Sequence, residues 1–258
     1  ERDKFHIKKY LSNDIELKDI TDDLCVFGLF GPKSRDLIKA ISKDNFDNDN
    51  FKFGTAKYIS IEGVKIWAQR LSYVGELGYE LYVDLKDTQK IYELLIEQGK
   101  DFNLSNCGMH AMDIMRMESG FLHWGHDISP EENQFQAGLS FTISNKKDVD
   151  FIGKQSLEKI KKENQKSRFT MFTLKDSEPG KPLLLHDEPI YIDDKIIGRS
   201  TSGNYSFNFK KNLVFGYIKS ELSNDELKSK NLFIEVEKQK YPIVVQSGPL
   251  KRTDFKNL

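Results

Sequence analysis

The sequence is poor in cysteine, and it has neither a long apolar run nor an excess of charge of one sign. Its two cysteines, Cys25 and Cys107, lie far apart and form no CxxC motif, so we expect both to be reduced and structural. No run approaches the roughly 20 apolar residues that cross a bilayer, and no signal-peptide pattern opens the chain. We therefore expect a cytoplasmic location and no membrane partner. The 39 basic and 40 acidic residues are interspersed, which does not favour a nucleic-acid partner.

Several catalytic motifs are also missing. The sequence has no P-loop, no GxGxxG after a strand, no nucleophile elbow and no usefully spaced Cys/His pair. These absences disfavour nucleotide hydrolysis, Rossmann-type binding and acyl transfer. The HWGHD run from His123 to Asp127 resembles a metal-binding motif, but a catalytic zinc needs three protein ligands on fixed elements. The run has turn-like spacing and no obvious distant third ligand, so we expect no metal site.

The first 164 residues mix helical and strand patterns. Leu24–Phe30 is an apolar run typical of a buried strand, and Gly31-Pro32 leads into a helix at Ser34–Ile41, with proline near the helix start. Other expected helices are 1–11, 88–98, 108–120 and 154–164, and other expected strands are 15–18, 56–61, 64–72, 79–83 and 139–143. This pattern indicates an α+β fold for residues 1–164.

From Arg168 onward short strands dominate, separated by polar turns. Six runs alternate or are apolar in the way that strands of a small antiparallel barrel are: FTMFTL, PLLLHDEPIYI, KIIGRSTSG, NLVFGYIK, LFIEVE and YPIVVQ. We expect a domain boundary between about 164 and 168, with residues 165–258 forming a C-terminal β-barrel domain.

The run RLSYVGELGYELYV, residues 70–83, combines an acid with aromatic residues. Alternation along the strand places Tyr79, Leu81 and Val83 on one face and Glu80 and Tyr82 on the other. A carboxylate on a strand face can accept two N–H donors from a pterin or guanidine-like edge. Pattern alone more often fits a glutamate in water, and Tyr73 fits a half-buried strand tyrosine.

The run from Gly108 to Phe141 places a cation among apolar residues. Methionines at helical spacing predict a helix that carries Arg116 and breaks at Gly120 into an aromatic, His-rich turn. Asp113, three residues before Arg116, can pair with it, and a structural ion pair is favoured over a binding role. Charge beside aromatic surface in both runs is typical of a pocket for a flat, hydrogen-bonding ligand.

The run Thr201 to Ser206 carries hydroxyls, a glycine and Tyr205 between two expected barrel strands. Such a loop can close over a ligand, and its bare pattern also fits a polar hairpin loop.

Four motifs in order carry a family resemblance: YVGELGYELYV, AMDIMRMESGFLHWGHDISPEENQFQAGLSFTI, FIGKQSL at 151–157 and GRSTSGNYSF at 198–207. Over nearly the whole chain the sequence resembles the C-terminal, folate-binding part of dimethylglycine and sarcosine dehydrogenases. That part is similar to the aminomethyltransferase, or T-protein, of the glycine cleavage system. The resemblance implies a cloverleaf-like arrangement of three small domains around tetrahydrofolate, the last a β-barrel, with the N-terminal part incomplete in this sequence.

The resemblance also implies site residues. The family's pterin-binding acid and aromatic fall on Glu80 and Tyr73, and the full implied folate-binding set is Tyr73, Glu80, Leu81, Tyr82 and Trp124. Residues expected to support the pocket are Arg116, Asp127, Ser202 and Tyr205.

Two departures limit what the resemblance carries over. Met112 occupies the place of an arginine in the T-protein ARDxxRLE helix, which favours the dehydrogenase branch. The family's catalytic aspartate and the FAD-binding domain of the dehydrogenases would both precede Glu1.

The implied function is one-carbon transfer. A flavin-dependent dehydrogenase domain, in cis or in trans, would supply an iminium, and tetrahydrofolate held by this chain would capture its carbon as 5,10-methylenetetrahydrofolate. Two alternatives stay open: an aminomethyltransferase acting on a lipoyl carrier, and a non-catalytic folate-binding or regulatory module. Whether this chain alone is an enzyme stays open as well.

Overall fold

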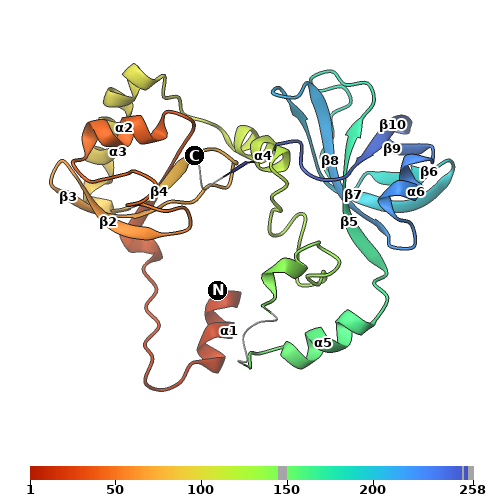
Figure 1. The fold of residues 1–258 in the computed structure, drawn as a ribbon, viewed down its shortest axis with the longest axis horizontal. Coiled ribbons are helices and arrows are strands. Elements are labelled where there is room, and N and C mark those ends of the chain that lie inside the picture. Colours follow the sequence, from red (N-terminus) through yellow and green to blue (C-terminus); the bar gives the residue numbers. More distant parts are fainter. Residues whose placement is uncertain (145–149, 252, 255–258) are drawn as a thin grey trace. The chain divides into compact units, whose positions relative to one another are not determined.

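A computed structural model describes residues 1–144, 150–251 and 253–254 (Figure 1). The described residues form two compact units. The first contains Glu1–Ser72 and Glu76–Asn106, and the second contains Tyr73–Gly75 and Cys107–Asp254. This division concerns compactness alone, so the domain boundary expected between 164 and 168 stays a prediction.

The first unit is built on a four-stranded antiparallel sheet with the order β1-β4-β3-β2. The strands are β1 (Leu24–Phe30), β2 (Ala56–Ile61), β3 (Val64–Gln69) and β4 (Gly78–Asp84). Glu62 and Gly63 join β2 to β3, and both have positive φ, as a tight two-residue hairpin requires. The strand β4 lies inside the sheet, paired with β1 and β3.

Two helices cover one face of this sheet (Figure 1): α2 (Ser34–Ile41) and α3 (Thr88–Gly99). Their apolar residues, such as Ile38 and Ile91, are fully buried in one core with Leu81 and Val83 of β4. The opposite face carries half-buried and exposed side chains, and we call it the open face. The remaining helices of this unit are α1 (Arg2–Tyr10), which has no buried residue, and the 3₁₀ turns η1 (Thr21–Asp23), η2 (Leu85–Asp87) and η3 (Lys100–Phe102).

The second unit contains a closed antiparallel barrel with the strand order β10-β5-β8-β7-β6-β9. Its strands are β5 (Ser167–Leu174), β6 (Pro189–Ile192), β7 (Lys195–Ser206), β8 (Lys211–Lys219), β9 (Leu232–Val236) and β10 (Gln239–Gln246). Alternate residues of β8, Val214 and Ile218, point into the barrel, where they pack with Phe172 and Ile234. Closure leaves no strand edge unpaired.

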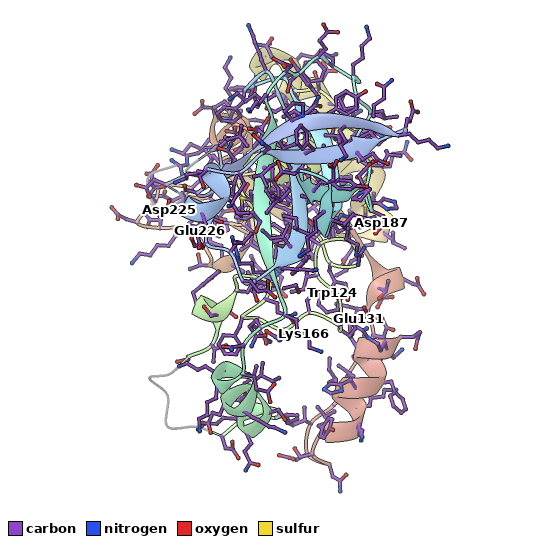
Figure 2. All side chains as sticks on the ribbon, turned by 90° about the vertical axis from the view of Figure 1, so that its right-hand side faces the viewer. Trp124, Glu131, Lys166, Asp187, Asp225 and Glu226 are labelled. Atoms are coloured by element: carbon purple, nitrogen blue, oxygen red, sulfur yellow. The ribbon has the colours of Figure 1, made fainter. Side chains whose placement is uncertain are left out.

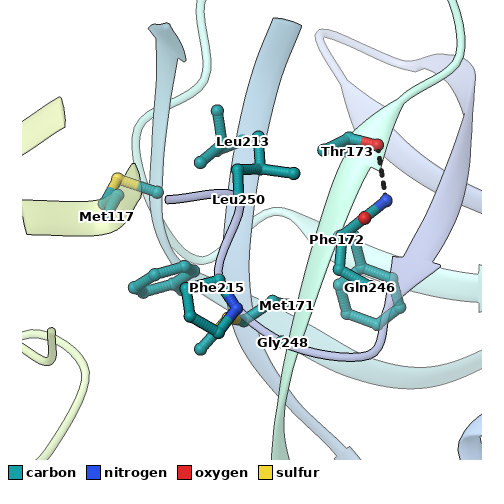
Figure 3. A pocket seen from close by; sticks show the side chains of 10 residues that line it. Met117, Met171, Phe172, Thr173, Leu213, Phe215, Gln246, Gly248 and Leu250 are labelled. Carbon is teal, nitrogen blue, oxygen red and sulfur yellow. Dashed lines mark hydrogen bonds between the residues drawn. The ribbon is translucent and has the colours of Figure 1, made fainter. Parts of the chain in front are cut away.

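The helix α4 (Met109–Glu118) packs on the outside of the barrel. Ile114 and Met117 form a second cluster with Leu213 and Phe215, the outward-facing residues of β8. A cavity of about 10 Å³ remains beside this contact, lined by Met117, Met171 and Leu250 among others (Figure 3). It has room for no more than one water, so it is not a ligand site. The unit also contains η4 (Ser140–Thr142), α5 (Lys154–Lys162) and α6 (Asn224–Lys228).

The expected fold class is confirmed: an α+β fold is followed by an antiparallel C-terminal barrel. Three expected local structures are wrong. Residues 15–18 form no strand. Residues 139–143 form no strand either, because their centre is the 3₁₀ turn η4 (Ser140–Thr142), in which Phe141 is 80% exposed. Residues 201–206 are not a loop but the second half of β7, because their backbone pairs with β8.

Candidate functional site

Glu80 and Tyr82 lie next to each other on the open face of the first unit. Alternation in β4 buries Tyr79, Leu81 and Val83 and leaves Glu80 and Tyr82 half-buried, as the sequence predicts. The Tyr82 hydroxyl donates a hydrogen bond to Oε2 of Glu80 at 2.9 Å. Burial, followed by the hydrogen bond to Glu80, raises the pKa of Tyr82, so this phenol remains a proton donor at neutral pH.

Leu81 faces away from these two residues. Its side chain is fully buried in the core beneath α2 and α3. Its backbone is paired with Phe27 on one side and Ala68 on the other. The structure therefore does not bring the Leu81 side chain to the face that carries Glu80.

Tyr73 belongs to the second unit. Its hydroxyl donates to the carbonyl oxygen of Leu122 at 3.1 Å, and its ring stacks on Phe121 with centroids 6.3 Å apart. Burial raises the pKa of Tyr73, which keeps the phenol neutral. Tyr73 thus anchors the start of the segment that follows α4.

Arg116 on α4 is the centre of a buried polar cluster in the second unit. Its guanidinium is 1% exposed and lies 2.7 Å from Asp113, the partner expected from helical spacing. It also donates to Oγ of Ser202 at 2.7 Å and to the carbonyl oxygen of Phe121 at 3.0 Å. A second ion pair, to Asp127, completes the cluster. Arg116 therefore joins α4, the segment after it and β7.

Asp127 is fully buried, and both of its carboxylate oxygens accept hydrogen bonds. Its Oδ1 accepts from Thr201 at 2.5 Å and from Ser202 at 2.8 Å, and its Oδ2 accepts from Arg116 and from the backbone N–H of His123 at 2.9 Å. Neighbouring residues of a regular strand point to opposite faces, so two successive hydroxyls would not reach one oxygen. The register of β7 against β8 shifts between Ser200 and Ser202, and this bulge makes the double contact possible.

The turn after α4 presents Trp124. Asp127 closes this turn because its N–H donates to the carbonyl oxygen of His123 at 2.8 Å, and Gly125 adopts φ 92° between them. Trp124 remains 56% exposed (Figure 2), so its ring is held on a fixed turn and faces solvent. Burial, followed by the charge effects of His126 and Arg116, lowers the pKa of His123 in this turn.

The histidines of this turn lie close to one another. The rings of His123 and His126 lie 4.6 Å apart, and His186 is the next ring beyond His126. Within the part of the chain that the structure describes, no group of three His, Cys, Asp or Glu side chains is arranged to hold a metal ion.

Tyr205 lies outside the Arg116 cluster. It is half-buried in β7, and its ring meets Phe207 edge-on at 5.1 Å. A buried acid that the sequence did not single out lies nearby: Glu118, 1% exposed, accepts from Ser206 at 2.6 Å and from Asn208 at 2.9 Å. Its helical position and charge gave no signal of burial, since its partners are far away in the sequence.

Two aromatic residues and a glutamine around Glu80 were missed as well. Phe30, Trp67 and Gln69 share the open face with Glu80, because the register of β1 and β3 against β4 places them there. Alternation within each strand predicts which of its residues share a face, but only the strand order shows which residues of different strands lie side by side on that face.

Among the described residues, none of the helices has the length and apolar character of a membrane span.

The chain matches two family models and is similar in sequence to several known proteins. Residues 1–147 match the GCVT N-terminal domain, and residues 168–251 match the glycine cleavage T-protein C-terminal barrel domain. Human mitochondrial dimethylglycine dehydrogenase is 34% identical over 93% of this chain and 27% of its own length. Human mitochondrial sarcosine dehydrogenase is 31% identical over 79% of this chain and 22% of its own length.

The aminomethyltransferases among the relatives are shorter than the dehydrogenases. The aminomethyltransferase of Symbiobacterium thermophilum is 30% identical over 80% of this chain and 54% of its own length. The chain thus spans about a quarter of the dehydrogenases and about half of this transferase. The crystal structure of the glycine cleavage system aminomethyltransferase T from Bartonella henselae shares the fold, with a TM-score of 0.74 over 88% of this chain and 60% of that one, at 19% identity. Since the N-terminal domain match alone covers more than half of the residues, this chain belongs to the glycine cleavage T-protein family.

Proposed function

We propose that this chain binds tetrahydrofolate and acts as the one-carbon-transfer region of a flavin-dependent dehydrogenase of N-methyl amino acids. The observation that carries the proposal is Glu80, a half-buried carboxylate on the open face with Tyr82 as its neighbour. Sequence similarity favours a dehydrogenase region over an aminomethyltransferase, because human dimethylglycine dehydrogenase matches 93% of this chain.

Glu80 has the capacity to bind the ring of a folate. An ionised carboxylate offers about four acceptor positions. Within the described residues, the Tyr82 hydroxyl is the one side-chain donor that uses them. The remaining positions suit the N–H edge of a pterin, which presents adjacent donors in one plane.

Glu80 and Tyr82 have different roles in binding the ring. Glu80 accepts hydrogen bonds from the ring and orients it, and Tyr82, kept protonated by its raised pKa, holds the carboxylate in place. When bound, tetrahydrofolate supplies two secondary amine nitrogens that take up the methylene of an iminium, with release of the demethylated amine and one proton. The iminium comes from two-electron oxidation of the N-methyl amine by the flavin of a dehydrogenase domain, in cis or in trans.

We also propose Tyr73 and Trp124 as folate-binding residues, on grounds separate from those for Glu80. Both are aromatic residues of the second unit, and Trp124 has the larger accessible ring. Arg116, Asp127 and Ser202 support Trp124 by fixing its turn. We propose that Tyr205 supports the folate pocket from β7. We propose no folate contact for the Leu81 side chain, because it lies in the core.

A second candidate function is that of an aminomethyltransferase. The barrel match and the similarity to the Symbiobacterium thermophilum enzyme favour it. Both functions use folate, and they differ in the donor of the carbon unit. Turnover with an aminomethylated lipoyl carrier in the absence of any flavoprotein would select the transferase.

Binding of tetrahydrofolate to the 258-residue chain, measured by calorimetry, tests the proposal. Glu80→Ala is expected to weaken binding by roughly 1–3 kcal/mol, the size of a hydrogen bond to a charged group. Glu93→Ala, which removes an exposed carboxylate from α3, serves as the matched control and should bind like the wild type. Equal affinity of Glu80→Ala and the wild type would remove Glu80 from the site.

The cytoplasmic location also remains a proposal. The human dehydrogenases that resemble the chain are named as mitochondrial proteins. Fractionation of the source cells, with the chain followed by antibody, distinguishes the two compartments.

A further inference from the structure

Two neighbouring cross-strand rows run over the open face of the first unit. One row is aromatic and apolar, with one residue from each strand: Val26, Tyr82, Trp67 and Tyr58. The other contains Gly28, Glu80, Gln69 and Ala56. Residues directly opposite each other on antiparallel strands have Cβ atoms about 5 Å apart. Glu80 therefore stands between Gly28 and Gln69, with the aromatic row along one side.

Phe30 occupies the other side of Glu80. A Cβ added to Gly28 or to Gly78 would collide with the Phe30 ring, so this ring lies over both glycines. Gly28 is the partner of Glu80 on β1, and Gly78 precedes Glu80 by two residues on the same face. The ring thus lies flat against the sheet beside the carboxylate, and it is only half-buried.

Gln69 faces Glu80 from β3. Its side-chain amide makes no hydrogen bond within the part of the chain that the structure describes, although the residue is half-buried. A primary amide can both donate and accept. An acceptor, Glu80, and a donor, Gln69, therefore lie side by side on the open face, and the Phe30 ring lies beside the acceptor.

We propose that Phe30 is the stacking surface, and Gln69 the second hydrogen-bonding residue, for the bicyclic ring that Glu80 binds. Glu80 accepts from the ring's N–H groups, Gln69 donates to the adjacent ring carbonyl oxygen, and Phe30 packs against the flat side. The inference rests on the proposed folate function and adds two residues that determine specificity for the ring.

Shielding of glycines by a neighbouring aromatic ring stabilises sheets by itself. It accounts for the position of Phe30 over Gly28 and Gly78. It does not account for the carboxylate of Glu80 beside the ring or for the amide of Gln69 opposite that carboxylate on β3. The test must therefore separate stability from binding.

Calorimetry on the full 258-residue chain, with tetrahydrofolate and with a tetrahydropterin that lacks the folate tail, provides this separation. We expect Phe30→Leu to weaken both ligands by the same factor, at least about fivefold, which is the lower end for loss of a stacked aromatic ring. Gln69→Leu should weaken both ligands as well. Phe30→Tyr keeps the ring and should bind like the wild type. Phe5→Leu, which removes a ring that is 73% exposed on α1, is the matched control.

Each outcome has one meaning. If Phe30→Leu and Gln69→Leu bind within twofold of the wild type while Glu80→Ala loses affinity, the inference is wrong and the proposed function stands. Failure of the wild type to bind tetrahydrofolate would instead overturn the proposed function. A tetrahydropterin that does not compete with tetrahydrofolate at millimolar concentration also overturns the inference. Should Phe30→Leu unfold, Gln69→Leu and the competition by tetrahydropterin still decide between these results.

Discussion

Arg116 and Asp127 form an ion pair that is almost completely removed from solvent, with side-chain exposures of 1% and 0%. The pair joins the end of α4 to the turn that presents Trp124, and the hydroxyls of Thr201 and Ser202 tie it to the barrel. A buried pair of this kind is tolerated because every remaining donor and acceptor is satisfied. It fixes local geometry in the second unit and adds no surface charge.

Asp127→Ala should destabilise the second unit strongly. Removal of one partner leaves Arg116 buried with Asp113 as its remaining carboxylate, and breaking a buried pair costs about 3–5 kcal/mol. Urea unfolding followed by the fluorescence of Trp124, with Trp67 replaced by Phe in every protein compared, measures this cost. Asp225→Ala, which breaks an exposed pair with Lys228, should change stability far less, because water screens an exposed pair. Equal effects of the two changes would show that the Arg116 pair does not stabilise the fold.

Thr201→Val should lower stability through the loss of one hydroxyl. The valine keeps the branched shape in the bulge of β7 but leaves Oδ1 of Asp127 with Ser202 alone, at a cost of about 1–3 kcal/mol. Thr201→Ser keeps the hydroxyl and should restore most of the stability. The free energies of unfolding of the three proteins give the comparison, and a serine variant as unstable as the valine variant would show that the methyl group matters instead.

His123 should make stability dependent on pH. Burial lowers its pKa in the folded chain from the usual 6.5, so below pH 6.5 the unfolded chain binds more protons than the folded one. The stabilisation is fully present above about pH 6.5 and is lost as the pH falls towards the folded pKa. His123→Gln should flatten this part of the melting-temperature profile, whereas His6→Gln, an exposed change on α1, should leave it unaltered. An unchanged profile for His123→Gln would assign the dependence to another group.

Local sequence patterns predicted an element correctly where its hydrophobic period and its turn residues indicate the same structure. Leu24–Phe30 and Ser34–Ile41 begin and end where an apolar run, a Gly-Pro turn and a helical period place them. The pair Arg116 and Asp113 followed from helical spacing, because both residues lie on one element. Signals of this kind need no knowledge of the rest of the chain.

Pairing between strands that are far apart in the sequence explains why some predictions were wrong. The run 139–143 is as apolar as a strand, but none of the strands that the structure describes pairs with it, and a short apolar run does not distinguish between structures. Small polar residues made 201–206 resemble a loop, yet pairing with β8 decides their structure. The partners of Asp127 on β7, and the ring of Phe30 beside Glu80, depend on strand order, which no local pattern contains.

The affinity of the wild-type chain for tetrahydrofolate, compared with that of Glu80→Gln, tests the central claim most directly. The glutamine keeps the size of the side chain and a partner for Tyr82 but removes the charge that accepts the ring's N–H groups. Saturable one-to-one binding by the wild type, weakened by about 1–3 kcal/mol in Glu80→Gln, is the predicted result. Absence of binding by the wild type, or the same affinity for both proteins, would contradict it.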